Sequence, residues 1–531
     1  MARTAKEFVE QHTAEIKPVI KEGVLAEWAA NRSGRKEDFD RKAELEKKKV
    51  KIYGRADEFE EVTGFHKAVA SIADPLVARQ VELIYLSYRG AQDKKKVLSK
   101  IIETQNSIAQ QFNSFRGEYK GEKRSNNFLE DLLIESNDSN EVKAAWEARK
   151  QIGVSTAPAL RDLAILRNEH AQSLGCADYY KFMLEQSEME CSQLFTILEE
   201  VEKITDPLFR EFKDNLDTRL ASEFKIAKSD LRPWHYRNPF FQELPPEPGL
   251  TLDPIFADKN LEKITEDYYV GQGLPIHDML EHSDLYEREG KCQHAFCISP
   301  DAPSDVRVLC NIRPNERWMS TMLHEFGHAT YDHNYDPQMA YLLRCPAHQF
   351  TTEGYAMLNE RIMRSADFLS DVVGVERAKA EEIERKMANH NGRRLLIFAR
   401  WALVMAYFER GLYEDPKQDL NALWWKTVER FQWVKAPERL ACPDWATKQH
   451  FVDAPVYYHN YLLGEMFASQ MMVMIRREIG PKGKIVGNKA VGSLLTEKIF
   501  RPAATKRWDA FVEAATGKPF SAECFMKDLS A

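Results

Sequence analysis

Two histidines and a glutamate near the middle of the chain have the types and spacing of a metal site. Residues 322–328 read MLHEFGH and contain the pattern H-E-x-x-H. Because residues four apart share one face of a helix, His324 and His328 can bind the same zinc ion. Glu325 lies beside that face, where it can take a proton from metal-bound water. Three fixed positions also arise by chance, so the interpretation needs a third ligand.

Catalytic zinc usually takes three protein ligands and leaves a fourth position open. The metzincin pattern is excluded, because Tyr331 and Asn334 occupy the positions where it needs glycine and histidine. A ligand nineteen residues after the second histidine would fall on Ala347, which cannot bind metal, although the neighbouring His348 makes this class harder to exclude. Glu353 follows the second histidine after 24 intervening residues, in a segment that predicts another helix. We therefore predict that Glu353 is the third ligand.

The H-E-x-x-H segment followed by Glu353 at this spacing resembles the thimet oligopeptidase and oligopeptidase F family. It also indicates kinship to the angiotensin-converting enzyme family, in which this spacing is usually one residue shorter. The resemblance implies that Glu360 holds a ligand histidine by a hydrogen bond. It also implies that His294 and Ala295, at the end of a short strand, bind the substrate backbone.

A second segment, residues 448–465, resembles the stretch with which both families stabilise the tetrahedral intermediate. The resemblance assigns Tyr458, Tyr461 and His450 to this role, in which phenol and imidazole groups donate hydrogen bonds to the oxyanion. His450 is displaced by one residue from its position in the oligopeptidases. Lys448 matches the lysine with which converting enzymes bind the substrate's C-terminal carboxylate. Asn460 stands where they have a chloride-binding arginine, so chloride activation is not implied.

The resemblance implies an elongated, mainly helical (all-α) gluzincin peptidase with a deep central channel and a small antiparallel β element near the active site. Residues 1–531 would form one catalytic domain in two helical lobes, about 1–230 and 231–531. The implied function is hydrolysis of short peptides with one Zn²⁺ ion, as an oligoendopeptidase. Three alternatives stay open: a peptidyl-dipeptidase, a hydrolase of a non-peptide amide, and a catalytically idle peptide-binding protein.

Several helices and one hairpin must position these residues. Asp74-Pro75 and Asp206-Pro207 each read as an acidic cap followed by proline at the start of a helix. Asp453 and Pro455 predict a further helix start. Residues 292–298 and 306–312 predict two short antiparallel strands, whereas the six prolines between residues 233 and 254 exclude a helix through that segment.

The overall composition agrees with a folded enzyme. The chain has 531 residues, of which 44% are hydrophobic, and a net charge of -8. The negative charge argues against a nucleic acid or an anionic membrane as a partner. The sequence has no apolar signal segment or membrane span, so we expect a cytoplasmic location. The oligomeric state is not predictable from the sequence.

Overall fold

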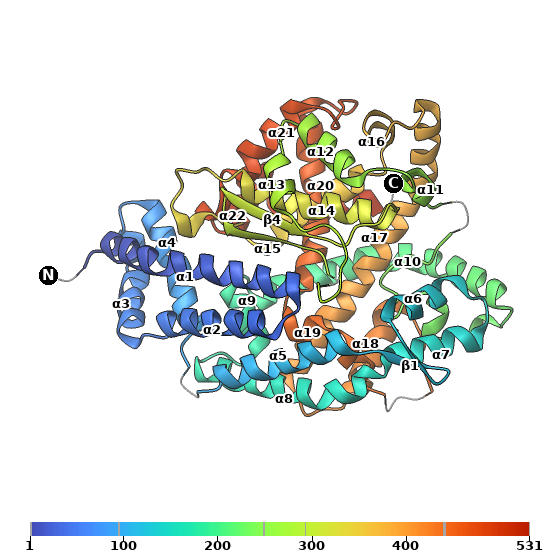
Figure 1. Ribbon diagram of the computed structural model, residues 1–531, viewed down its shortest axis with the longest axis horizontal. Helices are drawn as coiled ribbons and strands as arrows, with labels where there is room; N and C mark the ends of the chain where they lie inside the picture. Colours follow the sequence, from blue (N-terminus) through green and yellow to red (C-terminus); the bar gives the residue numbers. More distant parts are fainter. Residues whose placement is uncertain (1–2, 94–95, 248–249, 293, 439–441, 530–531) are drawn as a thin grey trace. The chain divides into compact units, whose positions relative to one another are not determined.

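The computed structural model of the chain describes residues 3–93, 96–247, 250–292, 294–438 and 442–529 (Figure 1). The chain divides into two compact units, and each unit is assembled from separate segments. Unit 1 comprises Met1–Gln92, Thr251–Met387 and Leu463–Cys524. Unit 2 comprises Asp93–Leu250, Ala388–Leu462 and Phe525–Ala531. Over the described part of the chain, no helix combines the length and the apolar character that crossing a membrane requires.

Unit 1 contains four N-terminal helices, a hairpin and further helices before and after the hairpin. Its elements are α1 (Ala5–Ser33), α2 (Lys36–Tyr53), α3 (Ala56–Lys67), α4 (Pro75–Gly90), α11 (Asp253–Phe256), α12 (Leu261–Gly271), α13 (His277–His282), β3 (Phe296–Asp301), β4 (Asp305–Leu309), α14 (Glu316–His333), α15 (Gln349–Ile362), α16 (Ala366–Asp371), α21 (Lys489–Leu495) and α22 (Trp508–Thr516). In Figure 1, α1 and α2 lie side by side, and the β3–β4 hairpin lies beside α14, on which it packs.

Unit 2 is a second helical assembly with a hairpin of its own. Its elements are α5 (Leu98–Ser114), β1 (Gly117–Tyr119), β2 (Glu122–Arg124), α6 (Asn126–Glu135), α7 (Ser139–Lys150), α8 (Ile152–Ser173), α9 (Tyr179–Gln186), α10 (Cys191–Phe224), α18 (Leu420–Gln432) and α19 (His450–Asp453). Three helices have residues in both units: α17 (Arg377–Glu414), α20 (His459–Ile479) and α23 (Glu523–Leu529). Single turns of 3-10 or π helix connect several of these elements.

The predicted fold class is confirmed, because the described chain is mainly helical and its strands form small antiparallel hairpins. The predicted strands, residues 292–298 and 306–312, differ in their bounds from the observed strands, Phe296–Asp301 and Asp305–Leu309. Residues 310 and 312 leave the hairpin, since their amide groups donate to the carbonyls of Asp284 and Leu285. The first strand instead extends to Asp301 through a register shift after Ile298, which accommodates Pro300 in the strand.

One predicted helix start is correct and another is wrong. Asp74 caps α4, where its side chain accepts hydrogen bonds from the amides of residues 76 and 77. Asp206 and Pro207, however, lie inside α10. Proline removes one helical hydrogen bond and displaces the turn before it. The buried Arg400 contacts the turn before the proline, because it donates to the Glu202 carbonyl at 3.4 Å and also binds the Asp206 carboxylate. The helix continues through the proline.

Three glycines in unit 1 allow helices α14, α15 and α20 to approach closely. A Cβ atom on Gly327 would lie 2.9 Å from the Cα atom of Ala356 in α15. A Cβ atom on Gly354 would lie 2.9 Å from the carbonyl oxygen of Gly464 in α20, and one on Gly464 would lie 3.0 Å from the Cβ atom of Glu353. These distances are below ordinary contact distances, so larger side chains would push the helices apart.

We predict that Gly354→Ala lowers the free energy of unfolding by about 1–3 kcal/mol, because its Cβ would meet the backbone of α20. Gly64→Ala in α3 is the matched control, since nothing lies within 4 Å of the added Cβ. Alanine should stabilise that exposed position by about 0.5–1 kcal/mol through its better helix propensity. Chemical denaturation of both variants measures the difference; equal stability of the two variants would contradict the close crossing.

Candidate active site

Unit 1 brings the three predicted zinc ligands together. His324 and His328 lie on α14, and Glu353 lies on α15. The Nε2 atoms of the histidines are 3.1 Å apart, and Oε2 of Glu353 lies 3.5 Å from the first and 3.7 Å from the second. Within the described residues, this is the one cluster of three such side chains whose ligand atoms all lie within 4.8 Å of one another.

The local sequence explains why these helices begin where they do. Asn315 caps α14, because its side-chain oxygen accepts a hydrogen bond from the amide of Trp318 at 2.9 Å. His348 caps α15 by accepting from the amide of Phe350, so this histidine, the nearest competitor to Glu353 in the sequence, serves the helix terminus. Tyr269 of α12 donates to the carbonyl of Leu323 at 2.5 Å and ties α12 to α14.

The distances among the three ligand atoms fit a tetrahedral metal ion. Ligands that each lie 2.0–2.1 Å from a tetrahedral zinc are about 3.3 Å apart. The remaining ring nitrogens have other partners: Nδ1 of His324 donates to Glu360 at 2.5 Å, and Nδ1 of His328 hydrogen-bonds the hydroxyl of Thr352 at 2.7 Å. Each ring therefore presents Nε2 to the other two ligands. Two nitrogens and one carboxylate oxygen are a donor set that zinc prefers.

Charges in this cluster follow from burial and from the neighbouring carboxylates. Burial lowers the pKa of His328 to about 4. Burial also disfavours the charged form of His324, but its hydrogen bonds to Glu353 and Glu360 outweigh this effect and raise its pKa. Burial, together with the nearby carboxylates, raises the pKa of Glu325 to about 7. A cation held by the cluster would lower that pKa, because positive charge favours the carboxylate.

Glu325 is held against the β3–β4 hairpin. Its side chain is buried, with 8% exposed, and it accepts a hydrogen bond from the backbone amide of Cys297 in β3. The hairpin therefore orients the side chain that follows the first ligand. His294 and Ala295 lie just before β3; the side chain of His294 is exposed and Ala295 is half-buried. Gln293, next to them, lies outside the described residues.

Unit 2 brings the other predicted residues together. The ring centroids of His450 and Tyr458 are 5.0 Å apart, those of Tyr458 and Tyr461 are 5.2 Å apart, and those of His450 and Tyr461 are 6.2 Å apart. The predicted helix start at residues 453–455 is wrong, because α20 begins at His459 and Tyr458 immediately precedes it. Val456 causes the delay, since its φ of 56° is incompatible with a right-handed helix.

Lys448 is buried beside this aromatic cluster. Its Nζ atom donates to Oε1 of Gln242 at 2.8 Å and lies 5.3 Å from the ring centroid of Tyr458. The rings of Phe240 and Trp401 flank the same ammonium group at 4.9 and 5.1 Å. Burial lowers the pKa of Lys448 to about 7.

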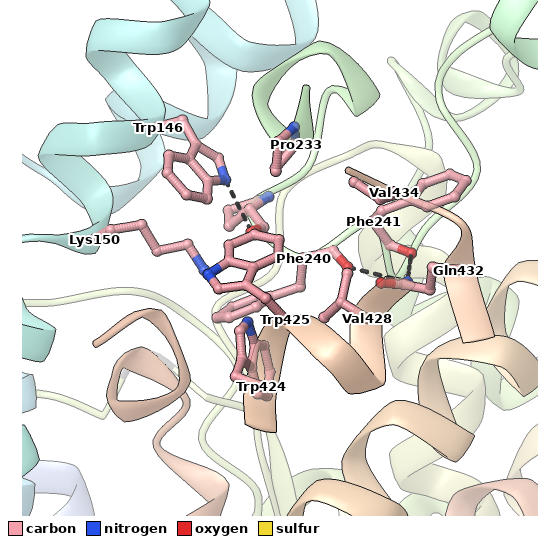
Figure 2. Close-up of a pocket in the computed structure, with 11 residues that line it drawn as sticks. Trp146, Lys150, Pro233, Phe240, Phe241, Trp424, Trp425, Val428, Gln432 and Val434 are labelled. Carbon is pink, nitrogen blue, oxygen red and sulfur yellow. Dashed lines mark hydrogen bonds between the residues drawn. The ribbon is translucent and has the colours of Figure 1, made fainter. Parts of the chain in front are cut away.

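A small cavity in unit 2 is lined mainly by apolar side chains, five of which are aromatic (Figure 2). Its volume of ≈ 20 Å³ is enough for about one water molecule and too small for a peptide. Trp146 donates to the carbonyl of Pro239 at 3.1 Å, and Gln432 donates to the carbonyl of Phe241 at 2.7 Å. The lining thus fixes the proline-rich segment, and with it Phe240, against α7 and α18.

Sequence reasoning missed several partners of the predicted residues. Thr352, which hydrogen-bonds His328, directly precedes Glu353, and this adjacency in the sequence could have indicated its role. Ser320 donates to Glu360 at 3.0 Å, and lies four residues before the first histidine ligand. Trp401 donates from Nε1 to the hydroxyl of Tyr458 at 2.7 Å, but a tryptophan in an apolar helical stretch does not differ from ordinary core in sequence.

Comparison with known proteins places the chain among peptidases. A family model described as angiotensin-converting enzyme matches residues 1–233, and the model of peptidase family M3 matches residues 279–528. No curated protein matches the chain. The sequence motifs that resemble these enzymes all lie after residue 290. The match to residues 1–233 extends the kinship to the N-terminal helices. The chain is therefore a zinc metallopeptidase, a hydrolase that acts on peptides, with kinship to both the angiotensin-converting enzymes and family M3.

Proposed function

We propose that the protein is an oligoendopeptidase that cleaves short peptides internally with one zinc ion held by His324, His328 and Glu353. The observation that carries this proposal is the triangle of ligand atoms, with sides of 3.1, 3.5 and 3.7 Å, beside the buried Glu325. Zinc bound there supplies a Lewis acid that polarises the scissile carbonyl and lowers the pKa of water. Thr352 and Glu360 hold the two imidazoles in the orientation that this requires.

The remaining steps belong to side chains of this chain. Glu325 takes the proton of the attacking water and then delivers it to the leaving amine, so that one carboxyl serves as general base and general acid. Tyr461, Tyr458 and His450 donate hydrogen bonds to the negatively charged oxygen that forms on the carbonyl carbon. Tyr458 suits this role because its oxygen accepts from the indole of Trp401, which is a donor only, and its own proton is left for another acceptor.

A peptidyl-dipeptidase is the second candidate. Lys448 and Gln242 favour it, because an ammonium group and an amide at 2.8 Å from each other can together bind the C-terminal carboxylate of a peptide. The enzyme would then release dipeptides from the C-terminus. His294 and Ala295 would bind the substrate backbone in either case.

We predict that Glu325→Gln lowers kcat/KM on a short fluorogenic peptide by about 10²–10⁴-fold, because the amide cannot accept the proton of water. The zinc content measured by elemental analysis should stay at one ion per chain. Glu384→Gln, at an exposed position of α17, is the matched control and should keep full activity. Substantial turnover by Glu325→Gln would contradict the role of Glu325 as the general base.

We predict that Glu353→Ala loses its zinc on dialysis, since only two protein ligands remain. Glu360→Gln should retain zinc more weakly, by about 10–100-fold in affinity, because it keeps a hydrogen-bonding group but loses the charge that orients His324. Elemental analysis after dialysis against graded chelator measures both, with circular dichroism as the control for folding. An unchanged zinc content in Glu353→Ala would refute the third ligand.

A peptide with a free or an amidated C-terminus separates the two candidate functions. An oligoendopeptidase should cut both forms at the same internal bonds and at similar rates. If Lys448 binds the carboxylate, amidation should lower kcat/KM by about tenfold or more, and Lys448→Gln should abolish the difference. That preference should weaken as the pH rises from 6 to 8, because the ammonium form is lost near pH 7; among neighbouring charges, Glu243 raises and Arg149 lowers the pKa of Lys448.

A further inference from the structure

The segment between His450 and Tyr458 in unit 2 is held at both ends by buried ionisable side chains. Arg167 of α8 binds its first part, and Glu409 of α17 binds its second part. Both residues are almost completely buried, with 1% and 2% of their surfaces exposed. A buried charge is costly unless its partners satisfy it. The partners of these two residues are therefore informative about what they do.

Arg167 holds the short helix that begins with His450. Its Nη1 atom donates to the carbonyl of Phe451 at 2.7 Å, and its Nη2 atom donates to the carbonyl of Val452 at 2.8 Å. The helix is only four residues long, so these carbonyls have few partners within it. The guanidinium also donates to the hydroxyl of Tyr413 at 3.0 Å, which fixes its own orientation.

Glu409 holds the turn before Tyr458. Its Oε1 atom accepts a hydrogen bond from the amide of Val456 at 2.8 Å. Val456 has a φ of 56°, a left-handed conformation that is strained for a β-branched residue and persists only where the surroundings impose it. This turn is the reason why Tyr458 precedes α20 instead of lying within it. The orientation of Tyr458, and of Tyr461 one turn later, thus depends on the amide that Glu409 binds.

Glu409 is suited to hold this amide while it is neutral. Burial raises its pKa to about 8, although the nearby charge of Arg167 and the amide of Val456 oppose this shift. A neutral carboxyl keeps a carbonyl oxygen that can accept the hydrogen bond. Glutamine has nearly the same shape and the same acceptor, whereas methionine has a similar length and no comparable acceptor.

We propose that Glu409 is a positioning residue of this peptidase, which imposes the left-handed turn at Val456 and thereby aims the hydroxyl groups of Tyr458 and Tyr461. Arg167 is its counterpart at the other end of the segment and places His450. The inference rests on the proposed role of His450, Tyr458 and Tyr461 in stabilising the oxyanion. The inference adds Glu409 and Arg167, which would act by orienting these three side chains and not by contacting the substrate or the metal.

The test compares Glu409→Met with Glu409→Gln in the full-length zinc enzyme. The methionine variant should lower kcat by about 10–100-fold, because small displacements of catalytic groups have effects of this size, while KM and zinc content stay the same. The glutamine variant should keep kcat within about twofold, since it retains the acceptor. Thermal unfolding shows whether both variants are folded; Glu409→Leu replaces the methionine variant if that one does not fold.

Two further measurements separate positioning from mere stabilisation. Amide hydrogen exchange in residues 450–461 should be faster in Glu409→Met and unchanged in Glu409→Gln. Adding Glu409→Met to Tyr458→Phe should lower kcat less than it does in the wild type, because one of the hydroxyl groups it aims is already absent. Unchanged exchange, a normal kcat in Glu409→Met, or an equal loss in Glu409→Gln would each overturn the inference.

Failure of the proposed function would look different. If the three side chains do not stabilise the oxyanion, full activity should remain in Tyr458→Phe, Tyr461→Phe and His450→Ala, each made with Glu409 intact. In that case a loss of kcat in Glu409→Met would have to come from another cause, and the positioning role would be overturned together with the oxyanion role.

Discussion

The close crossing of helices α14 and α15 is the constraint on which the candidate metal centre depends. Residue 327 lies between the proposed base, Glu325, and the proposed ligand His328, and it must be small because the Cα atom of Ala356 would lie 2.9 Å from any Cβ there. A wider crossing would carry Glu353 away from the imidazoles. The same requirement recurs where α15 meets α20, at Gly354 and Gly464. Small residues thus set the separation of the ligands, and the ligands themselves supply only the chemistry.

Hydrogen bonds convert this helix packing into a defined donor set. A helix crossing fixes the positions of Cα atoms, but it leaves the imidazole rings free to rotate. Glu360 and Thr352 remove that freedom through Nδ1 of the two histidines. Glu360 is fixed in turn, since Ser320 donates to its carboxylate at 3.0 Å and Arg364 donates to its backbone carbonyl at 3.2 Å. Each layer of contacts orients the layer inside it.

The sequence predicted those features whose determinants are local in the chain. The H-E-x-x-H helix and the mainly helical fold follow from spacing and residue type. Partners that come from distant helices could not be predicted. Trp401 reads as an ordinary core residue and Arg167 as an ordinary surface residue until the fold brings them to Tyr458 and Phe451. The assembly of each unit from separate segments could not be predicted for the same reason, since no local pattern indicates which helices pack together.

The two wrong helix starts share a feature. Asp206-Pro207 and Asp453-Pro455 both carry good local signals, in both cases the tertiary structure overrides the signal, and a buried ionisable side chain of α17 contacts the segment. Arg400 binds the turn before Pro207, and the helix passes through the proline. Glu409 binds the amide of Val456, so the helix is delayed until after Tyr458.

The second override stabilises a strained residue beside aromatic groups proposed to act in catalysis, whereas the first lies within a structural helix. Local rules are usually broken at a cost, and strained backbone is enriched at functional sites. The strain at Val456 is therefore independent support for assigning function to the segment from His450 to Tyr461, because it does not depend on the family resemblance that first suggested it.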